Sequence, residues 1–286
     1  MGVLDGKVAV ITGSSHGLGL AIAEAFVREG AAVVLAARSS DALKNAVDGL
    51  KQQGAKASGL STDVGDLSQV MALADHAIQM FGKIDIWVNN AGIGGVYGPT
   101  ASIDPELFER VIRTNIFGEY YGSLVALQHF LVQGAGGKLI NMLGRGDRQP
   151  VKFQSAYASS KTWVRSFTLS LAKEYAGTGI GIYALNPGLM NTELLRKVDA
   201  VKGYEKKLKP LSAVIRLWAE PLSVPAEKAV WLASSATDKK TGLDIQVLGT
   251  IGLVKGLLQE MRRIITRRTA PDTSLDITSV APYKML

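Results

Sequence analysis

Tyr157 and Lys161, four positions apart, are the first residues in this sequence whose types and spacing could do acid–base chemistry. They lie early in a stretch with helical periodicity, and residues at i and i+4 project from one face of a helix. The phenol and the ammonium could therefore meet one ligand. A free tyrosine has a pKa near ~10, and an adjacent cation favours the phenolate. Because the same spacing also occurs in ordinary surface packing, the pair needs support from other motifs.

A glycine-rich segment, Thr12-Gly-Ser-Ser-His-Gly-Leu-Gly19, supplies the second candidate site. Glycines let the chain turn sharply and let backbone N–H groups approach a pyrophosphate at the positive end of a helix. The spacing is G-x-x-x-G-x-G, not the commoner G-x-G-x-x-G. The alternative is a tight connection between a strand and a helix. Its position favours nucleotide binding through Gly13, Ser15, His16, Gly17, Leu18 and Gly19.

The end of the next apolar run, Ala36-Ala37-Arg38-Ser39-Ser40, indicates which nucleotide is bound. An acidic residue here would bind the ribose 2′-hydroxyl of NAD, whereas a basic residue accommodates a 2′-phosphate. Ala37 holds the expected acidic position, and Arg38 offers a planar, permanently charged fork. The alternative is a solvated arginine at a strand end. We predict NADP(H), favoured over NAD(H), with Arg38 and Ser39 in the site.

These motifs, with Asp63-Val64, Asn89-Asn-Ala-Gly92, Asn115, Pro187-Gly188 and Thr192, together resemble the short-chain dehydrogenase/reductase family over residues 5–249. The resemblance implies that Tyr157 is the general acid/base, that Lys161 lowers its pKa and binds the nicotinamide ribose, and that Asn115 holds a relay water. It further implies a set of cofactor contacts. These are Asp63 and Val64 at the adenine, Asn90, Ala91 and Gly92 beside the cofactor, Pro187 and Gly188, and Thr192 at the carboxamide.

One residue of the family pattern is absent. The family serine that binds the substrate oxygen lies thirteen positions before the tyrosine, and here that position is Gly144 in Asn141-Met-Leu-Gly144. Glycine has no side chain to donate a hydrogen bond. The candidates to replace it are the backbone amides of residues 144–146, Ser155 and Arg145.

Three short segments are similar to the chlorophyll b reductase branch of the family. They are residues 144–150, residues 186–195 and residues 218–221. This resemblance implies a bulky, apolar carbonyl substrate.

The elements that must position these residues alternate along the chain. Largely apolar runs of six or seven residues predict strands over 7–12, 32–37, 55–61, 84–89, 137–143, 180–185 and 243–248. Amphipathic patterns predict helices over 18–29, 41–53, 67–81, 105–131, 155–176 and 223–234. Continuous apolar strands alternating with such helices indicate an α/β fold, a single Rossmann-type doubly wound domain over residues 1–249 with a seven-stranded parallel sheet.

Two segments depart from this alternation. Residues 191–220 are helical in pattern and form an insertion that we expect to be a substrate lid. Residues 250–286 form a helical, basic amphipathic extension, with a polar, loosely ordered end from residue 269. A basic amphipathic helix can contact a membrane surface, but packing on the protein or on a partner subunit is favoured. Since no aromatic residue interleaves the basic ones, no nucleic-acid partner is expected.

Composition narrows the remaining classes. The 286 residues include no Cys and only three His, so neither a disulfide nor a metal site is expected. The formal charge of +7 is read as a solubility feature, and the start lacks a secretory signal, which predicts a cytoplasmic protein. We expect a homo-oligomeric NADP(H)-dependent oxidoreductase acting on a small-molecule carbonyl or alcohol. The alternative is a non-catalytic cofactor-binding or assembly protein that retains the fold.

Overall fold

The computed structural model describes residues 2–249, 256, 258, 260, 261, 263, 265, 266 and 272–284. At its centre lies a parallel sheet in the order β3-β2-β1-β4-β5-β6-β8. Its strands are β1 (Val8–Thr12), β2 (Ala32–Ala37), β3 (Ala57–Ser61), β4 (Ile86–Asn89), β5 (Gly137–Met142), β6 (Ile180–Asn186) and β8 (Leu243–Gln246). The predicted seven-stranded, doubly wound sheet is confirmed.

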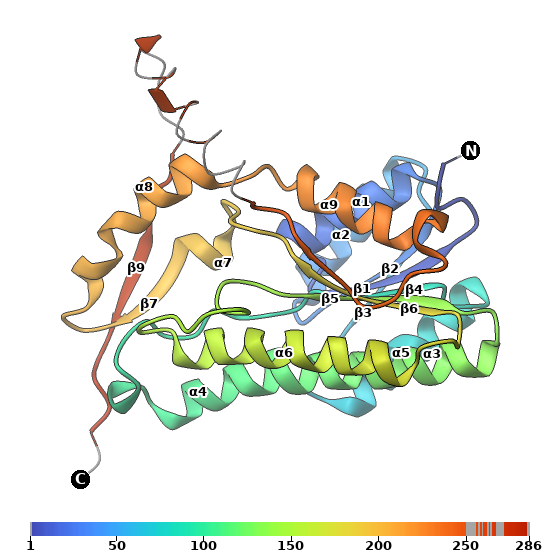
Figure 1. Ribbon diagram of the computed structural model, residues 1–286, viewed down its shortest axis with the longest axis horizontal. Coiled ribbons are helices and arrows are strands. Elements are labelled where there is room, and N and C mark those ends of the chain that lie inside the picture. Colours follow the sequence, from blue (N-terminus) through green and yellow to red (C-terminus); the bar gives the residue numbers. More distant parts are fainter. Residues whose placement is uncertain are drawn as a thin grey trace.

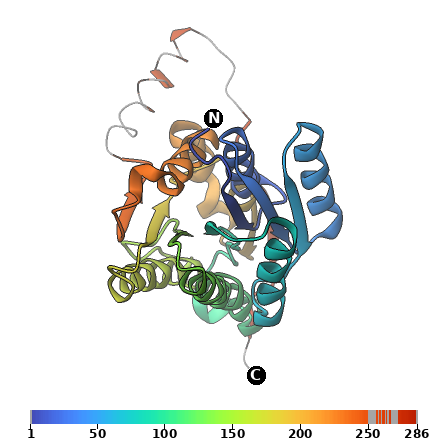
Figure 2. The same cartoon turned by 90° about the vertical axis from the view of Figure 1, so that its right-hand side faces the viewer.

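Helices cover both faces of the sheet, as strands that are apolar on both faces require. On one face lie α1 (Gly17–Arg28), α2 (Ser40–Gln52) and α9 (Ser223–Ala233) (Figure 1). On the other lie α3 (Leu67–Phe81), α4 (Pro105–Ile112), α5 (Gly118–Gln133) and α6 (Ser155–Glu174). The view turned by 90° shows the blue and orange helices on one side of the sheet and the green helices on the other (Figure 2). Each face has its own large apolar cluster.

The strand order reverses between β1 and β4, which pair in parallel at the middle of the sheet. In open sheets of this kind, ligands bind beyond the carboxyl ends of the strands at such a reversal. Hydrogen bonds fix the two strand ends here: the Thr12 hydroxyl accepts from the amides of Asn90 and Ala91, at 3.0 and 3.1 Å. The Asn90 side chain donates to the carbonyls of Thr12 and Gly13, both at 3.0 Å. The mouth of the crevice is therefore held by side chains from β1 and from the segment after β4.

The helix predicted over 105–131 is interrupted. Between α4 and α5, residues Arg113–Phe117 form one turn of π-helix. Its centre is Asn115, whose side chain exchanges two hydrogen bonds with the backbone of Ile93, at 2.9 and 3.0 Å. Wide turns of this kind are frequent at functional sites. Because the segments on both sides of the π turn are α-helical, the sequence pattern gives one long helix.

The 191–220 insertion is less helical than predicted. It contains α7 (Glu193–Arg196), β7 (Lys197–Val201), a short 3₁₀ turn over Glu205–Leu208, and α8 (Lys209–Trp218). The run Lys197-Val-Asp-Ala-Val201 forms a strand because it pairs with β9 (Asp276–Val280), within the segment expected to be loosely ordered. On its other edge, β7 bonds Tyr97.

The basic helix predicted over 251–268 lies for the most part outside the described residues. Within the described part of the chain, no helix combines the length and the apolar character needed to cross a bilayer. The same residues hold no group of three or more His, Asp or Glu side chains placed to bind a metal.

Candidate active site

A cavity of about 1250 Å³ opens beyond the carboxyl ends of the central strands. It brings together residues from the glycine-rich turn, the ends of β2, β3, β4 and β5, the start of α6 and the insertion. Every predicted cofactor-binding residue lines it: Gly13, Ser15, His16, Gly17, Leu18, Gly19, Arg38, Ser39, Asp63, Val64, Asn90, Ala91, Gly92, Tyr157, Lys161, Pro187, Gly188 and Thr192. The predicted catalytic residue Asn115 does not line it.

The glycine-rich turn is shaped to receive an anion. Gly13 has a φ of +63°, and a Cβ there would lie 2.7 Å from the Cα of Ala91, so only glycine fits without strain. Helix α1 begins at Gly17 without a side-chain cap, which leaves its first amides free to bind a ligand. A Cβ at Gly17 would meet nothing within 4 Å. The donor set and the open space fit a phosphate group of a dinucleotide.

At the end of β2, Arg38 is exposed and has no carboxylate within ion-pair distance among the described residues. Its backbone carbonyl accepts a hydrogen bond from the Ser61 hydroxyl at 3.1 Å. Ser39 is the N-cap of α2, accepting from the amide of Ala42 at 3.3 Å. Ser39 therefore has a structural role, and Arg38 is left as the charged group at this end of the cavity.

Asp63 and Val64 shape the wall next to β3. The Asp63 carboxylate accepts from the amide of Gly65 at 2.9 Å, and the Asp63 amide donates to the side chain of Gln69 at 2.8 Å. Val64 is buried, and a Cβ at Gly118 would overlap it. Hydrogen bonds of Asp63 and packing of Val64 thus fix this turn without a ligand.

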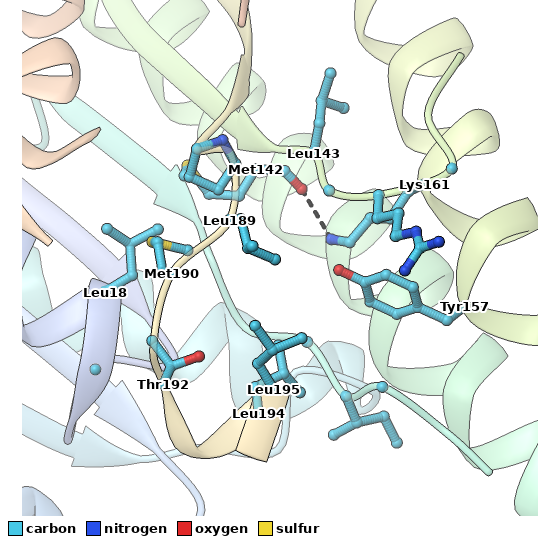
Figure 3. Close-up of a pocket in the computed structure, with 18 of the residues that line it drawn as sticks. Leu18, Met142, Leu143, Tyr157, Lys161, Leu189, Met190, Thr192, Leu194 and Leu195 are labelled. Carbon is cyan, nitrogen blue, oxygen red and sulfur yellow. Dashed lines mark hydrogen bonds between the residues drawn. The ribbon is translucent and has the colours of Figure 1, made fainter. Parts of the chain in front are cut away.

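Tyr157 and Lys161 lie one turn apart on α6 and face the cavity (Figure 3). Lys161 is 4% exposed, and its Nζ donates to the carbonyl of Met142 at 2.8 Å. Burial lowers the pKa of Lys161, while the Glu119 and Asp147 carboxylates raise it. Burial, and then the Asp147 carboxylate, raise the pKa of Tyr157 to about 12. At neutral pH the phenol thus holds its proton.

Gly144 touches the tyrosine directly. A Cβ at this position would overlap the Tyr157 hydroxyl. The amides of residues 144–146 donate to no other described group, and all three residues line the cavity. Ser155, the other candidate for the missing serine, pairs its hydroxyl with Thr100 at 2.8 Å and does not line the cavity. The backbone amides and Arg145 remain as donors near Tyr157.

Asn115 lies behind the cavity wall and is fully buried. Its side chain donates to the Ser160 hydroxyl at 3.1 Å, in addition to its bonds with Ile93. It thus ties the π turn to α6 immediately before Lys161. This position holds the local geometry, and the predicted role of Asn115 in the reaction stays a prediction.

The insertion and the two residues before it build an apolar wall opposite Tyr157. Leu189, Leu194 and Leu195 face the space beside the phenol, with Met190 and Thr192 nearer to Leu18 (Figure 3). Farther along, the lining residues from the insertion are Lys207, Leu208, Pro210, Leu211, Val214 and Trp218. The insertion also reaches the glycine-rich turn, because Glu193 lies 3.9 Å from His16. The insertion therefore forms part of the cavity wall both beside Tyr157 and beside the glycine-rich turn.

Two buried carboxyl groups, those of Glu119 and Asp147, are not among the residues that the sequence predicts for the site. Glu119 is 2% exposed and Asp147 is 6% exposed, and each has one carboxylate oxygen without a hydrogen-bond partner among the described residues. A signal for Glu119 was present, since it lies four positions after Asn115 on the same helical stripe. No comparable signal marks Asp147, whose burial depends on the loop after β5.

The sequence matches the short chain dehydrogenase family over residues 7–203. It is 37% identical over 257 residues to 3beta-hydroxysteroid dehydrogenase 1 of Eggerthella lenta, covering 88% of this chain and 96% of that protein. It is 32% identical over 257 residues to glucose 1-dehydrogenase 2 of Bacillus subtilis, covering 90% and 98%.

Solved structures agree. A gluconate 5-dehydrogenase from Burkholderia cenocepacia in complex with NADP and tartrate superimposes with a TM-score of 0.76 at 28% identity, covering 88% of this chain and 96% of that one. A single-residue variant of actinorhodin polyketide ketoreductase with NADPH superimposes with a TM-score of 0.77 at 29% identity, covering 88% and 99%.

Proposed function

Because this chain belongs to the short-chain dehydrogenase/reductase family and is an oxidoreductase of CH–OH and C=O groups, we propose that it is an NADP(H)-dependent enzyme for a bulky, apolar carbonyl or alcohol. The main support for this proposal is that a single cavity is lined by all the residue groups that such a reaction needs. The cavity is lined by the glycine-rich turn, by Arg38, by the Tyr157–Lys161 pair and by a leucine-rich wall.

Tyr157 is the proton-transfer group of the proposed reaction. Its raised pKa keeps the phenol protonated at neutral pH, as a general acid in carbonyl reduction requires. The Lys161 ammonium, fixed by the Met142 carbonyl, lies one helical turn away to stabilise the phenolate that remains. In oxidation of an alcohol, the same phenolate would take the proton back.

The nicotinamide, when bound, supplies or accepts the hydride. The amides at the start of α1 would hold its pyrophosphate, Asp63 and Val64 would flank the adenine, and Arg38 would bind the 2′-phosphate. Asn90, Ala91, Gly92, Pro187, Gly188 and Thr192 would line its nicotinamide half. The absence of an acidic residue at position 37 supports NADP(H) over NAD(H).

The part of the cavity proposed to bind the substrate has apolar side chains and backbone amide donors. Leucine side chains of the apolar wall line the space beside Tyr157. The free amides of residues 144–146 would bind the substrate oxygen in place of the family serine. Since Gly144 has no side chain, the Tyr157 hydroxyl can lie directly against its backbone.

A panel of apolar ketones, aldehydes and alcohols with NADPH and NADH, run on wild type and Tyr157→Phe, tests the proposal. Turnover of the best substrate should fall by roughly 100- to 10,000-fold in Tyr157→Phe, because only the proton-transfer group is lost. Binding of NADPH, followed by fluorescence titration, should stay within about twofold of wild type.

Tyr120→Phe is the matched control, since Tyr120 is an exposed tyrosine on α5 outside the cavity lining. It should behave as wild type. Near-normal turnover in Tyr157→Phe would show that Tyr157 is not the proton-transfer group. Binding of NADPH without turnover of any panel member would favour the non-catalytic alternative.

A further inference from the structure

Two exposed lysines, Lys152 and Lys207, line the same cavity as Tyr157. Lys152 lies in the loop between β5 and α6, which also carries the amides of residues 144–146. Lys207 lies in the 3₁₀ turn of the insertion, between β7 and α8, and these two elements lie together at one end of the molecule (Figure 1). Both lysines therefore come from the segments proposed to bind the substrate, and neither comes from the turns proposed to bind the cofactor phosphates.

A single aromatic ring brings the two ammonium groups into one neighbourhood. Lys152 Nζ lies 5.0 Å from the centre of the Phe153 ring, and Lys207 Nζ lies 5.5 Å from the same centre. The two nitrogens are therefore no farther apart than the sum of these distances, 10.5 Å. Because the lysine stem is flexible, both ammonium groups can reach one oxyanion placed between them.

The position of Phe153 is fixed by its surroundings. Phe153 has a φ of +67°, and among the described residues it is the only one other than glycine with a positive φ. A bulky side chain rarely adopts this conformation, which persists only where neighbouring contacts hold it. Here the ring packs edge-on against Tyr97 and Tyr204, with centroids 5.5 and 5.1 Å apart, and the Phe153 carbonyl accepts from the amide of Gly98 at 3.0 Å. These contacts hold the loop that carries Lys152 against the insertion.

The charges of the two lysines are not balanced by the described part of the chain. No carboxylate there lies within 4.0 Å of either ammonium group. Glu205, in the same turn as Lys207, accepts instead from the Ser279 hydroxyl at 2.6 Å and from the amide of Gly203 at 2.8 Å. The face of an aromatic ring attracts a cation but leaves the N–H donors of the ammonium group available. The pair can therefore still bind an anion.

We propose that Lys152 and Lys207 form a subsite for an anionic group of the substrate. The substrate class is then a molecule with an apolar body, a carbonyl or hydroxyl group at Tyr157, and a carboxylate or phosphate at a distance from it. The leucine-rich wall would contact the apolar body. An ammonium group recognises an oxyanion as a point charge, so the lysines accept either kind of anion. This inference rests on the proposed function, since it names the substrate class for the same cavity.

The experiment uses pairs of ketones that differ in one charge. Each pair consists of a straight-chain methyl ketone that ends in a carboxylate and the methyl ester of the same compound, and the chain length is varied from pair to pair. The measurement is the ratio of kcat/KM for the acid to kcat/KM for the ester. It is made with NADPH on wild type, Lys152→Ala, Lys207→Ala and the double variant. Ketones that end in a phosphate monoester distinguish phosphate from carboxylate as the preferred group.

In wild type, the acid of the best length should exceed its ester in kcat/KM by about tenfold, because hydrogen bonds between charged groups favour it. Each single variant should lower this ratio, and the double variant should bring it to about one. Lys207→Glu should bring it below one, since a like charge then faces the carboxylate. At about 1 M salt, where charges more than ~3 Å apart are screened, the wild-type ratio should also fall toward one.

Lys206→Ala is the matched control. Lys206 is an exposed lysine of the same 3₁₀ turn that does not line the cavity, so its loss changes the net charge equally and should leave the ratio as in wild type. A second readout needs no turnover. Calorimetric titration of decanoate into the complex with NADP should show weaker binding to the double variant than to wild type. The dissociation constant of NADPH should stay within about twofold.

Equal ratios in wild type and the double variant would overturn the anionic subsite. So would an equal loss in Lys206→Ala, because the effect would then come from net charge alone. A double variant that binds NADPH tenfold more weakly with an unchanged ratio would assign the lysines to the cofactor instead. If no ketone of either series is turned over, the proposed function fails, whereas equal turnover of acids and esters by wild type rejects this inference alone.

Discussion

The Tyr157 hydroxyl occupies the space that a side chain at position 144 would need. A serine there could not simply be added as a second donor, because its Cβ would displace the phenol. The glycine at position 144 and the tyrosine at position 157 are therefore linked by packing, although they are separate features in the sequence.

Gly144→Ser should lower turnover by at least about tenfold, or about 1.4 kcal/mol in the barrier, because overpacking against Tyr157 displaces the proton-transfer group. Steady-state kinetics on the best panel substrate measures this. Gly144→Ala separates the causes, since it adds the Cβ without a hydroxyl and should lose as much. Higher turnover in Gly144→Ser with a loss in Gly144→Ala would mean that the hydroxyl fills a vacant donor position after all.

Arg38→Ala should weaken NADPH binding by on the order of 1–3 kcal/mol and leave NADH binding unchanged, because one charge-assisted contact to the 2′-phosphate is removed. Titration of both cofactors against both proteins gives the ratio. Lys51→Ala, at the far end of α2, is the matched control for loss of an exposed positive charge. An unchanged NADPH/NADH ratio would show that Arg38 is not the phosphate ligand.

The sequence identifies residues that line the cavity better than residues that lie behind it. The glycine turn, Arg38 and the Tyr157–Lys161 pair could be predicted because local spacing marks them. Asn115 lies behind the cavity wall, where its side chain bonds Ile93 and Ser160, and its catalytic role stays a prediction. Glu119 and Asp147 were missed because burial of a charged residue depends on tertiary packing and not on local pattern.

At the scale of helices and strands, the elements that depend on local sequence could be predicted, and those that depend on distant contacts could not. The strands of the sheet and their helices follow from apolar periodicity, which is local. The π turn at Asn115 and the strand β7 do not. The π turn is fixed by a side chain bonded to Ile93, and β7 exists because β9, far along the chain, pairs with it.

The β7–β9 pair holds the insertion in place. Ser279 donates to the Glu205 carboxylate at 2.6 Å, and Thr273 pairs with Ser212 on α8 at 3.0 Å. A chain ended at residue 271 should therefore keep NADPH affinity within about twofold, while KM for the best substrate rises tenfold or more, about 1.4 kcal/mol. Removal of residues 285 and 286 alone is the control. Equal loss of cofactor binding and substrate binding would show that the segment supports the whole cavity.

At the scale of the molecule, one cavity has two differently built halves. The cofactor half is formed by strand ends and tight turns of the seven-stranded sheet, each held by bonds within a few residues or between adjacent strands. The apolar half is formed by the insertion. This division explains why the sequence indicates the cofactor more sharply than the substrate.

The parallel pairing of β7 with β9 also carries a consequence for the time course of folding. The two strands belong to a separate two-stranded sheet, and closing the long stretch of chain between them costs entropy before their contacts are gained. Contacts between distant segments tend to form slowly, whereas the neighbouring βα units can form first. A refolding chain should therefore regain its dinucleotide cleft while the leucine wall is still unformed. During that interval the protein would capture its cofactor before it can select a substrate.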